Sequence, residues 1–167
     1  MDTTRTRSRI EQRPDVGDRP RGAVGEVATR AGALSPSVRV ASLLSAIVLL
    51  LATVASVLGL VVDDLYRGDP WGVQAFRGGD LVTLLVAMPI LAASLVLARR
   101  GSARATAVWI GMLGYCVYDF AFYAYQPVFN DAFVLHVAIL ALSVQALALA
   151  LGGVDRTAVG EALRNDR

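Results

Sequence analysis

The chain contains no lysine, and it has only one cysteine and one histidine among its 167 residues. Because Cys116 stands alone, an intramolecular disulfide, a paired-thiol redox centre and a thiolate metal cage are excluded. His136 belongs to neither an HxxxH nor an HExxH pattern, so the sequence predicts no metal and no other cofactor. Ser143 shares a helical face with His136 but lies about 10 Å further along, too far to be its nucleophilic partner. We therefore expect no catalytic residue and no enzymatic activity.

Charge is also nearly absent from four long segments of the chain. Of all residues, 55% are hydrophobic, and the mean hydropathy of +0.54 is well above that of an ordinary soluble domain. At a rise of about 1.5 Å per residue, each segment can cross a hydrocarbon core of about 30 Å as a helix. The sequence therefore predicts an all-α polytopic membrane protein, an antiparallel bundle of four transmembrane helices within residues 40–153. The predicted spans are 40–62, 81–98, 105–125 and 132–151.

The placement of arginine predicts how this bundle is oriented. Eight arginines precede the first span, two lie between the first and second spans, three follow the second, none follows the third, and three follow the fourth. The two sides of the membrane thus receive fourteen and two arginines. Under the positive-inside rule, both termini and the loop near residues 99–104 lie in the cytoplasm. This predicts a multi-pass protein of the inner (plasma) membrane.

Both ends of the chain are predicted to be cytoplasmic tails. Residues 1–39 contain Arg, Asp, Gly, Pro and Ser, few aliphatic residues and no aromatic residue. Such a segment buries too little apolar surface to offset its loss of conformational entropy, so we expect it to be disordered. Residues 154–167 form a short second tail. Acidic residues dilute the arginines of the first tail, which therefore falls short of a polybasic lipid anchor. The four spans make the lipid bilayer the expected partner, and we expect no nucleic acid to bind.

Small and polar residues in the first span are candidates for helix packing. At about 100° per residue, one helical face gathers Ser42, Ser45, Ala52, Thr53 and Ser56. Small side chains let helix backbones approach closely in lipid, so this face is predicted to pack inside the bundle. The alternative is a face that lines a path for a solute.

Proline and glycine predict two features around the second span. Pro89 lacks an amide donor and frees the carbonyl of Leu85, so a kink is expected there. Before the span, Pro70-Trp71-Gly72 and Arg77-Gly78-Gly79 are predicted to form turns of an outer loop, with the Trp71 side chain at the membrane interface.

The third span places polar side chains at membrane depth. Near its outer end, Tyr123 and Tyr125 are expected to join an interfacial belt of aromatic residues. Tyr115 and Tyr118 lie deeper, where their hydroxyl groups need hydrogen-bond partners. Asp119 lies about 9 Å below the outer end of the span, and a carboxylate there costs about 2.5–3.5 kcal/mol on insertion scales.

The fourth span supplies a possible partner for that carboxylate. His136 lies about 7.5 Å below the outer end, nearly the depth of Asp119 on the neighbouring antiparallel helix. This predicts an Asp119–His136 hydrogen bond supported by Tyr115 or Tyr118. The alternative is an outward-facing polar pocket that binds a proton, a metal ion or a small solute. Gln145 faces the opposite side of the fourth span and is predicted to pack against another helix or a second subunit.

Four short stretches of the sequence are similar to those of other proteins. They are Gly79-Asp80-Leu81, Arg100-Gly101-Ser102, Tyr115…Tyr118 and Phe129-Asn130…Phe133. Over residues 40–153 the chain resembles small four-span integral membrane proteins of bacteria, actinobacteria in particular, whose function is unassigned. The resemblance implies the four-span fold and transfers no functional residue. We expect a non-enzymatic accessory or interaction protein that binds itself or another membrane protein. The alternative is a small oligomeric transporter, or an ion- or proton-binding protein, that uses Asp119, His136, Tyr115 and Tyr118.

Overall fold

The computed structural model describes residues 35–63, 65–66, 70–125, 131–154, 157, 160 and 164. Every regular element among them is helical: α2 (Pro36–Val61), α3 (Pro70–Val82), the π-helical turn η1 (Thr83–Ala87), α4 (Met88–Arg99), α5 (Ala103–Ala124) and α6 (Phe133–Gly153). Because α3, η1 and α4 continue one another, the described chain has four helices long and apolar enough to cross a membrane. The predicted all-α, four-span fold class is confirmed. Residues 1–34 of the predicted tail lie outside the described residues.

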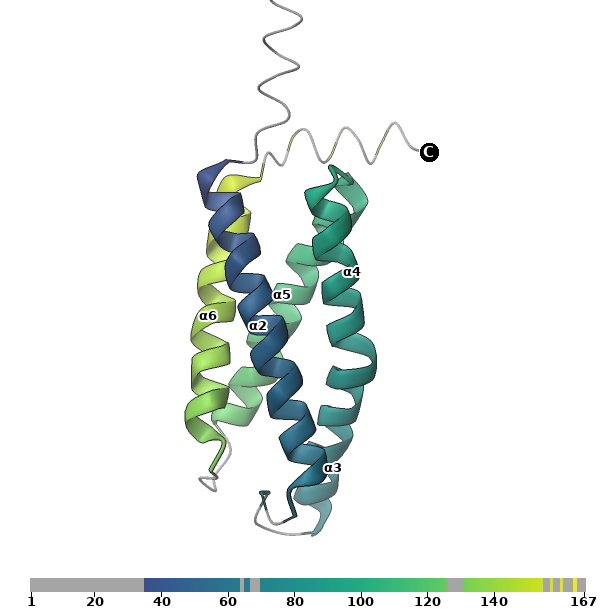
Figure 1. Cartoon of the computed structure of the whole chain (residues 1–167), viewed down its shortest axis with the longest axis vertical. Coiled ribbons are helices and arrows are strands. Elements are labelled where there is room, and N and C mark those ends of the chain that lie inside the picture. Colours follow the sequence, from purple (N-terminus) through teal and green to yellow (C-terminus); the bar gives the residue numbers. More distant parts are fainter. Residues whose placement is uncertain are drawn as a thin grey trace, which may run out of the picture. The chain divides into compact units, whose positions relative to one another are not determined.

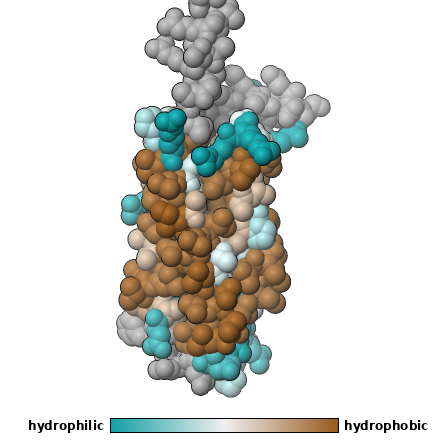
Figure 2. All heavy atoms as spheres, in the orientation of Figure 1, coloured by the Kyte–Doolittle hydropathy of each residue, from teal (hydrophilic) through white to brown (hydrophobic). Residues whose placement is uncertain are grey.

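The four long helices run antiparallel in a bundle (Figure 1). Helix α2 packs against α6 and against the helix formed by α3, η1 and α4, while α5 packs between α4 and α6. At one end, the Ser35 hydroxyl donates to the Gly153 carbonyl over 3.4 Å, so the first and last helices meet there. Figure 2 shows an apolar band around the middle of the visible face, with hydrophilic residues at both ends.

Local signals explain where two of the helices begin. Ser35 caps α2 by accepting from the Val38 amide, and Pro36 follows in the first turn, where its missing amide proton costs nothing. The helix thus starts four residues before the predicted span, and residues 36–39 belong to it. Ser102 caps α5 in the same way, and Gly101 adopts a φ of 90° in the turn before it.

The second membrane helix begins at Pro70, eleven residues before the predicted span. The turns predicted at Pro70-Trp71-Gly72 and Arg77-Gly78-Gly79 are therefore wrong, because all six residues are helical. Tertiary packing overrides the low helix propensity of glycine here. Val73 and Phe76 pack against a second core cluster, formed by Leu65, Tyr66, Tyr123 and Ala132.

Pro89 is preceded by the wide turn η1. The Met88 amide donates to the Thr83 carbonyl, five residues back, instead of to the residue four back as in an α-helix. In a regular helix the proline ring would meet the carbonyl of Leu85. The distortion expected at Pro89 thus takes the form of a π-helical turn, a feature that is frequent at functional sites.

The small-residue face of α2 lies in the bundle interior, where Ser42, Ser45, Ala52 and Ser56 are all buried. Ser45 joins two helices, because its hydroxyl oxygen accepts a hydrogen bond of 3.0 Å from the buried Trp109 indole on α5. Cys116 is buried in the same core. Gln145, in contrast, is exposed on α6 and does not pack inside the bundle.

Candidate functional site

The end of the bundle that lies opposite Ser35 and Gly153 is called the Tyr66 end. Asp80 is a carboxylate enclosed at this end. It is 3% exposed. The Tyr66 hydroxyl donates to its Oδ2 atom over 2.6 Å, and the Tyr123 hydroxyl lies 3.2 Å from Oδ1. The Tyr123 hydroxyl is also 3.1 Å from the Phe76 carbonyl. Two phenols from different parts of the chain thus hold one buried carboxylate, with charge-assisted hydrogen bonds.

A glycine lets this carboxylate approach α2 closely. A Cβ atom at Gly59 would collide with the Asp80 carboxyl group and would lie 2.6 Å from the Tyr66 hydroxyl. The Asp80 side chain therefore packs directly on the α2 backbone. Burial raises the pKa of Tyr66, and the hydrogen bond and negative charge of Asp80 raise it further. The Tyr66 hydroxyl consequently remains a protonated donor at physiological pH.

Asp119 is the second carboxylate of the Tyr66 end, and it is half-buried. The Thr83 hydroxyl donates to its Oδ2 atom over 3.1 Å, and the Tyr115 hydroxyl lies 3.0 Å from the Thr83 oxygen. A hydroxyl group can donate only one hydrogen bond. The Thr83 hydroxyl therefore donates its hydrogen bond to Asp119 and accepts one from the Tyr115 hydroxyl. Thr83 follows Asp80 by one helical turn, so one side of the second helix holds both carboxylates in place.

The predicted Asp119–His136 hydrogen bond is not formed. His136 is fully buried on α6, and its ring centroid lies 4.9 Å from that of Tyr123 and 6.1 Å from that of Phe120. Within the described residues, neither imidazole nitrogen has a hydrogen-bond partner. The prediction used depth alone, whereas the rotation of α5 turns Asp119 toward Thr83 and turns Phe120 and Tyr123 toward α6.

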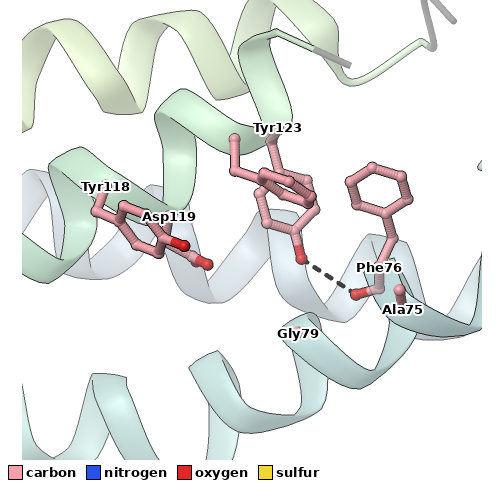
Figure 3. Close-up of a pocket in the computed structure, with 7 residues that line it drawn as sticks. Ala75, Phe76, Gly79, Tyr118, Asp119 and Tyr123 are labelled. Atoms are coloured by element: carbon pink, nitrogen blue, oxygen red, sulfur yellow. Dashed lines mark hydrogen bonds between the residues drawn. The ribbon is translucent and has the colours of Figure 1, made fainter. Parts of the chain in front are cut away.

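A pocket of about 170 Å³ opens between α3 and α5 beside Asp119 (Figure 3). Its lining comprises Ala75, Phe76 and Gly79 of α3 with Tyr118, Asp119, Phe122 and Tyr123 of α5. Tyr118 is 73% exposed and Phe122 is 60% exposed, so both stand at the open side. The pocket is thus an aromatic recess with a single carboxylate.

Among the residues that the structure describes, counter-charges are scarce around these groups. The one ion pair that is seen among the described side chains joins Arg77 to Asp63 over 3.0 Å at the surface. No set of three or more His, Cys, Asp and Glu side chains that could hold a metal ion occurs in the described part of the chain.

Sequence reasoning missed part of this arrangement. It assigned Tyr123 to an interfacial belt, but Tyr123 is 3% exposed and bonds to Asp80, whereas Tyr125 is 84% exposed. It did not single out Tyr66 or Thr83. The spacing of Asp80 and Thr83 would have placed them on one face, had the second helix been extended back to Pro70.

Comparison of the chain with protein-family models, with curated proteins and with solved structures found no match. The geometry of the Tyr66 end is therefore the basis for a functional proposal.

Proposed function

We propose that this multi-pass membrane protein resides in the plasma membrane with both termini in the cytoplasm, and that it binds a cation at Asp119. Fourteen of its 16 arginines lie in the tails, in the loop between α4 and α5, or in the helix ends beside them, which supports a cytoplasmic position for that end under the positive-inside rule. The Tyr66 end then faces outward. No catalytic residue is part of the proposal.

The observation that carries the proposal is the position of the Asp119 carboxylate. It lines the pocket between α3 and α5, and the hydroxyl group that donates to it, that of Thr83, is neutral. An acidic side chain inside a span is costly, by about 2.5–3.5 kcal/mol on insertion scales, and such residues commonly mark a path or site for an ion. A cation in the pocket would supply a counter-charge that the described side chains do not provide.

The test is cation binding by the purified full chain in detergent. Titrations with protons, with alkali and alkaline-earth chlorides and with ammonium salts should reveal a cation whose binding Asp119→Asn weakens by about tenfold or more. Asp63→Asn removes an exposed carboxylate from the same end and should leave the affinity unchanged. Equal binding of every cation by the wild type and Asp119→Asn would refute the proposal. Flux into proteoliposomes would separate a transporter from a binding protein.

The accessory or interaction role remains a second candidate, and Gln145 favours it. This side chain is exposed about half-way along α6, at a depth where lipid offers its amide no hydrogen-bond partner. A second copy of the chain, or another membrane protein, would satisfy it. Cross-linking in membranes should give a dimer that Gln145→Leu weakens and the neighbouring Val144→Leu does not. Equal cross-linking of the three proteins would argue against this interface.

A further inference from the structure

The geometry points to an alkylammonium group as the ligand of the pocket between α3 and α5. This inference rests on the proposed function, because it specifies which cation Asp119 binds. The group belongs either to a small organic cation in solution or to the headgroup of a lipid.

The walls of the pocket are the first argument. Phe76 packs against Phe122 and Tyr123, with centroid separations of 5.6 and 5.3 Å, so these three rings make a continuous surface. Tyr118 adds a fourth ring at the open side. Aromatic faces attract an organic cation through their quadrupole, and aromatic cages recognise quaternary ammonium groups in this way.

The scarcity of oxygen ligands is the second argument. Asp119 is the one carboxylate that lines the pocket, and the described residues hold no cluster fit for a metal ion. Ca²⁺ takes about 6–8 oxygen ligands, and Mg²⁺ requires a near-ideal octahedron of them. An alkylammonium ion needs only one counter-charge and apolar contact for its methyl groups, which is what this recess offers.

The size of the recess is the third argument. Its volume of about 170 Å³ is close to that of an apolar cavity of about 150 Å³ that accepts benzene. Tetramethylammonium, with five heavy atoms, fits this space. Gly79 helps to keep it open, since a Cβ atom there would come within 2.8 Å of the Tyr123 hydroxyl.

The position of the recess is compatible with an ammonium group from a lipid headgroup and with one from a small cation in solution. Asp119 lies about 7.5 Å from the end of α5, close to where lipid headgroups meet the hydrocarbon. Tyr118 and Phe122 are exposed on the side of the bundle. A ligand could enter from the headgroup layer as part of a lipid, or from the water beside it.

The experiment compares two probes of similar shape, tetramethylammonium chloride and uncharged neopentyl alcohol, by calorimetric titration of the full chain in detergent. We expect the wild type to bind tetramethylammonium about tenfold or more tightly than the alcohol. Asp119→Asn should abolish that preference while its amide oxygen still accepts from Thr83. Tyr118→Leu should weaken tetramethylammonium binding by about threefold to tenfold. Tyr125→Leu removes another exposed tyrosine, which lies outside the pocket, and should change nothing.

Thermal unfolding of each variant shows whether it is folded, and Phe122→Leu replaces Tyr118→Leu if the latter is not. If protons or inorganic cations bind through Asp119 but tetramethylammonium binds no better than neopentyl alcohol, the ammonium inference is overturned and the proposed function stands. If Asp119→Asn alters the binding of no cation, both fall. Unchanged tetramethylammonium binding in the folded variant, Tyr118→Leu or its replacement Phe122→Leu, would also overturn the inference.

Nanodiscs distinguish the two sources. In salt that screens surface charge, tetramethylammonium should bind more weakly in phosphatidylcholine than in phosphatidylglycerol if a lipid headgroup occupies the pocket. Equal affinity in both lipids identifies a free solute as the ligand. Either result supports the ammonium site, whereas no binding in either lipid contradicts it.

Discussion

At the scale of single residues, two carboxylates near one end of the bundle have different surroundings. Asp80 is enclosed and bonded by the Tyr66 and Tyr123 hydroxyls. Asp119 is half-buried, shares the Thr83 hydroxyl with Tyr115, and faces a pocket. Asp80 thus has a structural environment, whereas Asp119 is the carboxylate that we propose binds the ligand.

The close approach of Asp80 to α2 makes Gly59 sensitive to substitution. Gly59→Ala should destabilise the protein by about 1–3 kcal/mol, because the methyl group would displace the Asp80 carboxyl group and the Tyr66 hydroxyl. Gly114→Ala is the control, since a Cβ atom there meets nothing within 4 Å. It should change stability by no more than about 1 kcal/mol. Thermal unfolding in detergent measures both, and equal effects would contradict the packing of Asp80 on α2.

The raised pKa of Tyr66 predicts a dependence of stability on high pH. Above about pH 10 the unfolded chain releases the phenolic proton while the folded protein retains it, so rising pH favours unfolding. The stability that Tyr66 contributes is fully present below about pH 10 and is lost above it. The unfolding temperature of the wild type should exceed that of Tyr66→Phe at pH 8, and the gap should narrow between about pH 10 and 11. A constant gap over this range would contradict the prediction.

The hydrogen-bond partner of Asp119 can be tested with double-mutant cycles. Thr83→Val and Asp119→Ala should show a coupling free energy of about 0.5–3 kcal/mol, because each substitution removes the direct hydrogen bond between the two side chains. Asp119→Ala and His136→Phe should be additive within about 0.5 kcal/mol, since His136 contacts aromatic rings. Unfolding free energies in detergent give both couplings. The opposite pattern would restore the partner predicted from depth.

At the scale of the helices, contacts between elements decide which polar groups are satisfied. The Trp109 indole of α5 reaches across to Ser45 of α2, and the wide turn before Pro89 places Thr83 where α5 can meet it. Polar hydrogen bonds between spans fix the register of helices that apolar packing in lipid specifies only weakly.

Two buried serines of α2 allow a hydrogen bond between helices to be compared with a hydrogen bond within one helix. Ser45→Ala should cost about 1–3 kcal/mol, because it leaves the buried Trp109 N–H without its acceptor. The Ser42 hydroxyl donates only to the Val38 carbonyl of its own helix, over 2.8 Å. Ser42→Ala should therefore alter stability by about 0.5 kcal/mol or less. Unfolding in detergent measures both variants. Equal losses of stability would mean that the hydrogen bond from the Trp109 indole does not stabilise the protein.

At the scale of the whole molecule, an even number of spans places both ends of the described bundle on one side. The contact between Ser35 and Gly153 joins the start of the first helix to the end of the last. The apolar band corresponds to the hydrocarbon core of a bilayer, and its two polar borders correspond to the headgroup regions.

Labelling of intact cells tests the proposed orientation. In a chain carrying Cys116→Ala, an impermeant maleimide should react with Trp71→Cys, which replaces an exposed residue near the Tyr66 end. It should not react with Arg100→Cys, in the turn between α4 and α5, until the membrane is permeabilised. Strong external labelling of position 100 would invert the topology and place the pocket on the cytoplasmic side.

Composition and spacing were sufficient to predict the all-α class and the four spans, since long uncharged segments have few stable alternatives to a membrane helix. Local signals were weaker at Gly72 and Gly78, where turn-forming residues lie inside α3. Propensities of about 1 kcal/mol per glycine are overcome there by the packing of Val73 and Phe76 against the second core cluster, which contains Tyr66.

The candidate site depended on tertiary structure, because sequence separation and depth do not define helix rotation. Asp119 was identified from the sequence as an acid at membrane depth, but its partner is Thr83 and not His136. Tyr66 reaches Asp80 from a loop, and Gly59 makes room for both, so three distant segments of the chain build one carboxylate environment. The hydrophobic pattern of each span thus specifies that it crosses the membrane, while packing between the spans specifies which polar side chains meet.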